Sequence, residues 1–174
     1  MANVFESTNM ASTHYAERIF DAICDVDVEN GTFGYIEELA DGYSHIYNFV
    51  AGTKEGAFVV VVDQPVWSED ECRRTNQRKD KFVVEAGTAF RVRVVKERDE
   101  FACSEDGFAG QPEVGKYVAI NANGKLVVGD APVEGAAMNG RIMRTRVMGS
   151  TIVTGERKYG YSRKMYEVKV ETLA

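Results

Sequence analysis

Residues 82–128 read FVVEAGTAFRVRVVKERDEFACSEDGFAGQPEVGKYVAINANGKLVV, and this stretch decides the fold. Short runs of β-branched and aromatic residues are interrupted at regular intervals by Gly, Asn, Asp or Pro, which favour turns. In residues 90–94 the apolar side chains alternate with Arg91 and Arg93, as on a strand with one buried face. Residues 121–124 (NANG) predict a hairpin turn. The stretch therefore predicts a β-meander that closes into a barrel or a sandwich.

The same pattern continues on both sides of this stretch. Residues 18–28 alternate apolar and acidic side chains, and the pair Asn30-Gly31 predicts a hairpin turn that leads into a return strand at residues 33–36. Residues 57–62 (AFVVVV) predict a strand that is buried on both faces. Shorter apolar runs predict further strands at residues 44–50, 141–147, 151–154 and 165–170.

These patterns together predict a mainly β protein. We expect a single β-barrel or β-tulip-like domain over residues 18–174, with at most one or two short helices. Residues 1–17 have no clear periodicity and are expected to form an extended N-terminal arm.

Two segments interrupt the β pattern and are candidate contact sites. Residues 1–17 form either a disordered terminus or an arm that lies on another subunit. Residues 63–81 form either a solvated crossover loop or a site of partner contact, with a short helix capped by Ser68. The candidate interface residues of these segments are apolar, aromatic or basic: Val4, Phe5, Met10, Tyr15, Trp67, Arg73, Arg74 and Arg78.

The composition indicates a single domain that folds without disulfides or metals. The chain has 174 residues, three widely spaced cysteines and a net charge of -6. No apolar run approaches the roughly 20 residues that span a bilayer, and the N-terminus does not read as a signal peptide, so we expect synthesis and folding in a cytosol.

The charge is unevenly distributed along the chain. Residues 1–72 carry 14 acidic and 2 basic residues, a net of -12, and residues 73–174 carry 13 acidic and 19 basic residues, a net of +6. Either the two halves mark an interaction surface, or their strands interleave and the charges mix. The net acidity argues against general affinity for nucleic acid.

No residue pattern selects a catalytic or metal-binding site. The segment that starts at Asp25 begins like a calcium loop, but its sixth position is Asn30 and its twelfth is Ile36, where the loop needs Gly and a bidentate Glu. His14 and His45 lie outside any catalytic or ligand motif, and phosphate-binding glycine patterns are absent. We therefore expect no enzyme, no cofactor and no metal ion.

Arginines on several predicted strands allow two interpretations. Beside Phe90, Phe101 and Tyr117 they would resemble the nucleic-acid surface of an OB-fold. Alternatively they pair with acids of the N-terminal half, within the subunit or across an interface, and the acidic total charge favours this interpretation. The arginines concerned are Arg91, Arg93, Arg141, Arg144 and Arg146.

Seven short passages of turn and strand residues follow one another along the chain. They are residues 27–32 (DVENGT), 85–93 (EAGTAFRVR), 99–101 (DEF), 107–108 (GF), 114–118 (VGKYV), 124–126 (GKL) and 140–142 (GRI). In this order the passages resemble the head decoration (cement, or auxiliary capsid) proteins of tailed bacteriophages, with coverage from about residue 20 to the C-terminus. The resemblance implies a structural protein without catalysis that binds the outside of an icosahedral shell and clamps neighbouring capsomers.

The resemblance also implies partners and a location. We expect the major capsid protein as partner, self-association into a homo-oligomer on the capsid surface, and a place on the virion after synthesis in the host cytoplasm. The N-terminal arm and the Trp67 region would contact the capsid, so deleting residues 1–13 should weaken attachment and leave the domain folded. The alternative from another class is a β-barrel binding module for carbohydrate or single-stranded nucleic acid.

Overall fold

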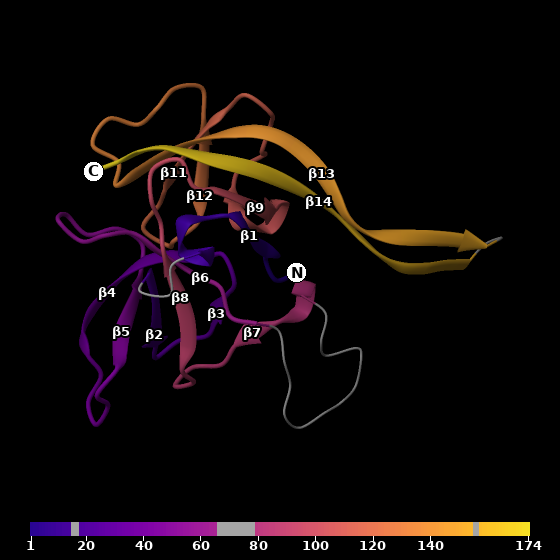
Figure 1. The fold of residues 1–174 in the computed structure, drawn as a ribbon. Coiled ribbons are helices and arrows are strands. Elements are labelled where there is room, and N and C mark those ends of the chain that lie inside the picture. The colour runs from indigo at the N-terminus through magenta and orange to yellow at the C-terminus, as the bar shows by residue number, and fades with distance from the viewer. Residues whose placement is uncertain (15–17, 66–78, 155–156) are drawn as a thin grey trace.

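The computed structural model describes residues 1–14, 18–65, 79–154 and 157–174, with only the backbone of residues 150–154 and 157–161. Its strands form a closed five-stranded barrel and a seven-stranded sheet that lie against each other, together with a small sheet of β3 (Val28–Glu29) and β7 (Val83–Val84) (Figure 1). Short 3-10 turns such as η1 (Ala11–Thr13) and η4 (Glu105–Gly107) join the strands. The mainly β, barrel-like fold predicted from the sequence is confirmed.

The barrel is filled by its own side chains. Its strands, in order around the barrel, are β2 (Ile19–Ile23), β5 (Ile46–Ala51), β4 (Phe33–Leu39), β6 (Val60–Val62) and β8 (Phe90–Val94). Phe49 and Phe90 meet inside it with ring centroids 5.5 Å apart, in a hydrophobic cluster that also contains Val60, Val62 and Val92. The alternation predicted for residues 90–94 is confirmed, since the apolar members are buried and the two arginines are only partly so.

The second sheet contains the longest strands of the molecule. Its order is β1-β9-β14-β13-β11-β12-β10. The bounds are β1 (Phe5–Asn9), β9 (Glu100–Ser104), β14 (Arg157–Leu173), β13 (Met138–Thr154), β11 (Tyr117–Ile120), β12 (Leu126–Gly129) and β10 (Phe108–Ala109).

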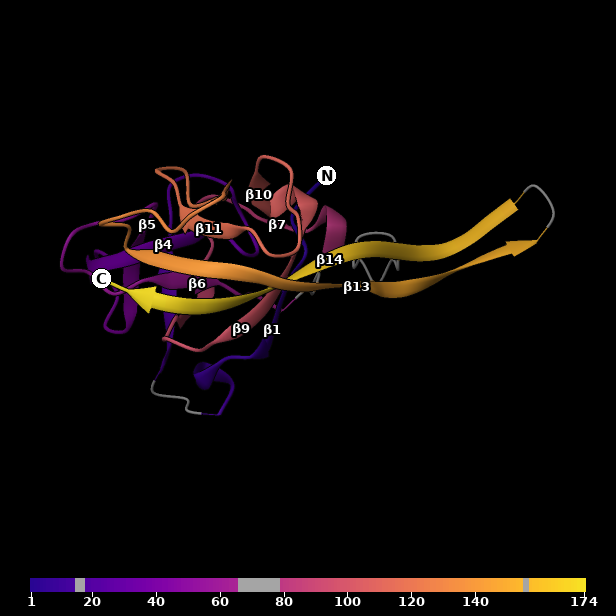
Figure 2. The ribbon, with the colours of Figure 1, turned by 90° about the horizontal axis from the view of Figure 1, so that it is seen from above.

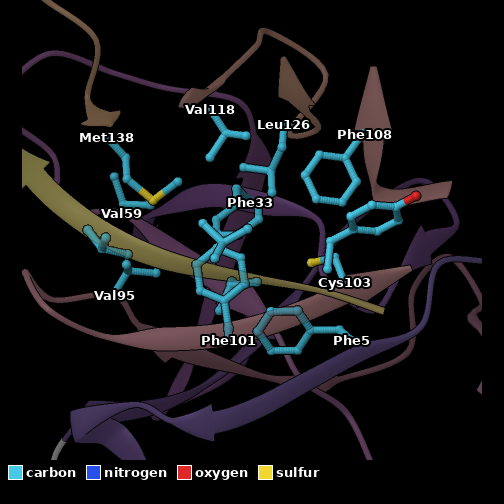
Figure 3. Packing of buried hydrophobic residues seen from close by; sticks show 14 of the residues in the cluster. Phe5, Phe33, Val59, Val95, Phe101, Cys103, Phe108, Val118, Leu126 and Met138 are labelled. Atoms are coloured by element: carbon cyan, nitrogen blue, oxygen red, sulfur yellow. The ribbon is translucent and has the colours of Figure 1, made fainter. Parts of the chain in front are cut away.

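The main hydrophobic core lies between the barrel and this sheet. Phe33 of the barrel meets Phe101 of the sheet with ring centroids 5.3 Å apart, and Phe5 contacts Phe101 at 5.6 Å (Figure 3). Val61 belongs to this core, whereas its neighbours Val60 and Val62 point into the barrel. The strand predicted at residues 57–62 is confirmed for residues 60–62, which form β6 and lie between the two cores, whereas residues 57–59 precede the strand and Phe58 is exposed.

The organising stretch is not a continuous meander. Its first long strand, β8, belongs to the barrel and pairs with β2 and β6, whereas β9 belongs to the sheet and pairs with β1 and β14. Only β11 and β12 form the predicted hairpin, around the turn in which the Asn121 N–H donates to the Lys125 carbonyl at 2.9 Å. The meander prediction was wrong here because turn residues mark where a strand ends and carry no information about its distant partners.

The N-terminal segment is part of the domain, and the prediction of a separate extended arm over residues 1–17 was wrong for its described part. Strand β1 pairs with β9, with Phe5 opposite Cys103. Val4, Phe5 and Met10 are 0%, 4% and 0% exposed. Because Val4 and Phe5 are buried on opposite faces of the sheet, in two different clusters, the segment lacks the strict alternation that signals a strand.

Two further predictions about turns need correction. The Asn30-Gly31 turn exists, with Gly31 at φ +79, but it does not form a hairpin, because β3 pairs with β7 and the Gly31 N–H donates to the Val62 carbonyl at 2.8 Å. The separate strands predicted at residues 141–147 and 151–154 are one strand, β13. Gly149 adopts φ +77 inside β13 and keeps its pairing with Ser162, so this glycine does not end the strand.

Candidate interaction site: the β13–β14 hairpin

A long hairpin projects from the globular part of the molecule (Figures 1 and 2). Strands β13 and β14 have 17 residues each, and their register runs from Met138 opposite Leu173 to Thr154 opposite Arg157. The neighbouring strand β9 pairs with β14 only from Met165 to Lys169, and β11 pairs with β13 only from Asn139 to Arg141. Beyond these pairs the hairpin is a two-stranded ribbon.

We call residues 147–154 and 157–164 the distal ribbon. At about 3.3 Å per residue, each of its strands extends roughly 26 Å from the last contact with β9. No third strand pairs with the distal ribbon within the described residues. A two-stranded ribbon is only marginally stable in water, so this element has the exposed backbone edges and the reach of a contact element.

Ion pairs hold the root of the hairpin in place on the outer face of the sheet. Arg144 and Arg146 of β13 both pair with Glu167 of β14, the second with Nε and Oε1 2.9 Å apart. Arg146 also pairs with Glu6 of β1, and Lys79 Nζ lies 3.1 Å from Glu6 Oε1. One charge network thereby joins strands β13, β14 and β1 to the 3-10 turn η3 (Lys79–Lys81).

The network determines the charge state of Glu6. Burial alone would raise the pKa of the Glu6 carboxyl, but the hydrogen bonds from Lys79 and Arg146, with their positive charges, outweigh burial and lower this pKa. Glu6 is therefore ionised at neutral pH, as the network requires.

Apolar and terminal contacts complete the root. Val4, Ala102 and Met165 form a small buried cluster against which Met148 packs, just where the distal ribbon begins. Arg163 Nη2 lies 3.3 Å from Asp106 Oδ2, next to the N-terminal ammonium. The hairpin thus leaves the sheet in a direction determined by β1, β9 and η4.

The hairpin and the rest of the chain have opposite charge. Residues 138–173 contain eight Lys and Arg and three Asp and Glu, a net of +5. Since the whole chain is -6, the remainder is -11. The excess of acid is concentrated in the barrel, where residues 19–58 contain eight acids and one base, Lys54.

An open cleft of about 500 Å³ lies at the end of the barrel near the β4–β5 turn. Its lining includes Asp25, Glu38 and Asp41 together with Leu39 and Tyr43. All five are exposed, and no ion pair is made by these three acids in the described part of the chain. The cleft therefore presents three acids without a direct ion pair beside exposed apolar surface, with Lys54 near Glu38.

The described residues contain no group of His, Cys, Asp and Glu that could hold a metal ion. Burial raises the pKa of the Cys103 thiol to about 12, because its effect is larger than the opposite effect of the hydrogen bond with Asn3. The thiol therefore stays protonated at neutral pH and is not a nucleophile. His45 is exposed, and its Nδ1 lies 3.3 Å from the Oγ of the adjacent Ser44.

The structure distributes the predicted interface residues differently from the sequence-based expectation. Val4, Phe5 and Met10 lie inside the chain's own cores and are not available to a partner. The other predicted contacts lie outside the described residues: Tyr15, Trp67, Arg73, Arg74 and Arg78.

The predicted arginine pairs are confirmed in part. Arg93 pairs with Asp63 and Arg146 with Glu6, both acids of the N-terminal half, whereas Arg144 pairs with Glu167. Arg141 stacks over Tyr117, with its guanidinium carbon 5.5 Å from the ring centroid. The OB-like surface does not form, because Arg91 and Arg93 lie on the barrel and the other three lie on β13, and because Phe90 and Phe101 are buried.

No family model, no curated protein and no solved structure matches this chain. Across the described segments, no helix is long and apolar enough to cross a bilayer. The hairpin itself was not recognised from the sequence, although residues 138–173 contain its signals: β-branched and aromatic residues, no proline and a local excess of positive charge.

Proposed function

We propose that this chain is a structural decoration protein that binds the outer surface of a phage head and links neighbouring capsomers. The observation that supports the proposal best is the hairpin, which extends from a domain with two filled hydrophobic cores. The order of turn-and-strand passages along the sequence supports it independently.

A decoration protein works by binding at separated points on an assembled lattice. Each contact can be weak, because the second contact is made at the high effective concentration that the first one provides. Such a protein stabilises the lattice by mass action, since it binds the assembled form and not the free subunits. The globular domain and the distal ribbon would be two contact regions of this kind, the domain against the head and the ribbon toward its neighbours on the lattice, with the charge network of Glu6, Arg146 and Glu167 fixing the direction between them.

The alternative function, a barrel that binds carbohydrate or single-stranded nucleic acid, has less support. The barrel interior is packed with its own side chains, among them Phe49, Phe90 and several valines. The arginines that would bind a phosphate backbone are distributed between two sheets. No described feature therefore favours this alternative over the decoration function.

A truncated hairpin tests the proposal. Replacing residues 149–162 with Asn-Gly joins Met148 to Arg163, which already face each other, through a two-residue turn. We expect the variant to keep the circular dichroism spectrum and the thermal stability of the domain and to lose co-sedimentation with heads that lack this protein, assembled from the major capsid protein encoded in the same genome. The matched control replaces Val133 and Glu134 of an exposed loop with Ser, keeps Gly135 at its positive φ, and should bind like the wild type. Equal binding of the truncated variant, or no binding of the wild type, would refute the proposal.

A further inference from the structure

The basic hairpin and the acidic barrel of this chain are complementary surfaces. We infer that the distal ribbon of one copy docks onto the acidic end of the barrel of a second copy, so that the molecules associate head to tail. This inference goes beyond the proposed function, because it identifies the occupant of the ribbon and applies with or without a capsid.

The donor surface is the distal ribbon. Residues 147–164 contain four basic residues, Arg157, Lys158, Arg163 and Lys164, and one acid, Glu156, and of the four Arg163 already pairs with Asp106 at the root. In the register of the ribbon, Lys158 is opposite Val153 and Lys164 is opposite Val147. Lys164 is exposed, and Val147 is 66% exposed, so charge and apolar surface lie together at the start of the ribbon.

The acceptor surface is the cleft at the β4–β5 end of the barrel. Asp25, Glu38 and Asp41 supply negative charge, and Leu39 and Tyr43 are large side chains that remain exposed, at 44% and 48%. A partner that combines lysine with an exposed valine matches both properties of this surface. These three acids make no ion pair within the described residues, although Glu38 lies close enough to Lys54 to interact with it, so docking of a basic ribbon would add positive charge to this surface.

The contact has to be made between molecules. In Figures 1 and 2 the hairpin extends away from the domain on the side opposite strands β4 and β5, whose connecting turn borders the cleft. The ion pairs and the apolar cluster at the root prevent the hairpin from folding back. The ribbon of one chain can therefore reach only the cleft of another.

Such a contact is heterologous, since it joins two different surfaces. Repetition of a heterologous contact produces a ring when the rotation closes and an open chain when it does not. Each molecule would use its ribbon once and its cleft once, so association should be sensitive to salt and should continue beyond a dimer.

Charge reversal tests the inference. The ribbon variant carries Lys158→Glu and Lys164→Glu, and the cleft variant carries Asp25→Lys and Glu38→Lys. The control carries Glu113→Lys and Glu134→Lys, two exposed acids in loops of the other sheet. Each acid-to-lysine change adds two charges, so the cleft variant and the control both shift the net charge from -6 to -2. Sedimentation velocity at about 0.02 M and about 0.5 M salt measures the association of each full-length protein, because charge screening is weak at the first and strong at the second.

We expect the wild type and the control to associate at low salt and to be 19.3 kDa monomers at high salt. Each reversed variant alone should associate at least about tenfold more weakly than the wild type at low salt. An equimolar mixture of the two variants should associate again, because the acidic ribbon of one meets the basic cleft of the other. This recovery separates docking from damage to the fold, since a misfolded variant would not regain association on mixing.

Several results would overturn the inference. It fails if the wild type stays monomeric at low salt up to about 1 mM, which is the weak end of specific affinities. It also fails if the mixture does not associate. If the wild type is monomeric and the ribbon variant alone loses binding to heads or to DNA, the ribbon contacts the capsid or nucleic acid and not a second copy. Conversely, association that persists in a protein that does not bind heads would refute the proposed function and leave the head-to-tail contact standing.

Discussion

Substitution of Phe5 by Ala distinguishes an N-terminal strand that is part of the core from an N-terminal arm that is not. Phe5 is 4% exposed and contacts two aromatic rings, Phe101 at 5.6 Å and Phe33 at 6.5 Å between centroids. Removal of a buried phenylalanine side chain costs about 3–5 kcal/mol, because its transfer free energy is lost and a cavity remains. We expect Phe5→Ala to lower the free energy of unfolding by about this amount, a large part of the roughly 5–15 kcal/mol that stabilises a domain.

The assay is urea unfolding followed by circular dichroism, with the free energy taken from the midpoint and the slope. Phe58→Ala is the matched control: Phe58 is 49% exposed, and this substitution should cost about 1 kcal/mol. If Phe5→Ala fails to fold, Phe5→Leu, with an expected cost of up to about 1.5 kcal/mol, supplies the measurement. A midpoint for Phe5→Ala equal to that of the wild type would show that the segment is an arm. By the same reasoning, deletion of residues 1–13 should unfold the domain, contrary to the expectation from the sequence.

Three other outcomes follow from the structure. Because the pKa of Glu6 is lowered in the folded protein, its charge network stabilises the fold above the usual pKa of 4.5, and this stabilisation is lost as pH falls through the folded-state pKa. Glu6→Gln should therefore be less stable than the wild type by up to about 1 kcal/mol at pH 7. In urea titrations this difference should shrink below pH 4.5. Gly124→Ala and Gly56→Ala both place a side chain at positive φ, at a cost of about 1–2 kcal/mol. The added Cβ at Gly124 also overlaps the Phe33 carbonyl oxygen, whereas the Cβ at Gly56 meets nothing, so calorimetry should show Gly124→Ala to be less stable by a further 1–3 kcal/mol or so. Equal costs would contradict the close approach at Gly124. Cys103 should resist iodoacetamide in the native protein and react after unfolding, as judged by peptide mass spectrometry, and fast native labelling would show that it is not buried.

Local features of the fold were predictable from the sequence. The alternation in residues 90–94 and the turn that begins at Asn121 depend on neighbours within a few residues, and both are confirmed, as is the last half of the run predicted to be buried on both faces, residues 60–62. These features fix which residues form strands and which faces are buried.

Long-range pairing was not predictable, because it depends on residues far apart in the chain. Phe5 is opposite Cys103, and β8 and β9 are consecutive in the sequence but belong to different sheets. The candidate site was missed for a related reason. Gly149 reads as a strand break, yet its backbone adopts a positive φ that the ladder tolerates, so one long hairpin was interpreted as several short strands.

The position of β13 and β14 in the sheet has a mechanical consequence. Both strands are central in the order of the sheet, with β1 and β9 on one side and β11, β12 and β10 on the other. Hydrogen bonds between strands run perpendicular to the strand direction, so tension applied along the ribbon loads many of them in parallel and does not peel them one by one. The core residues Ile142, Tyr166 and Val168 anchor the same two strands from beneath. Tension applied at the tip of the hairpin is therefore transmitted to the central strands of the sheet.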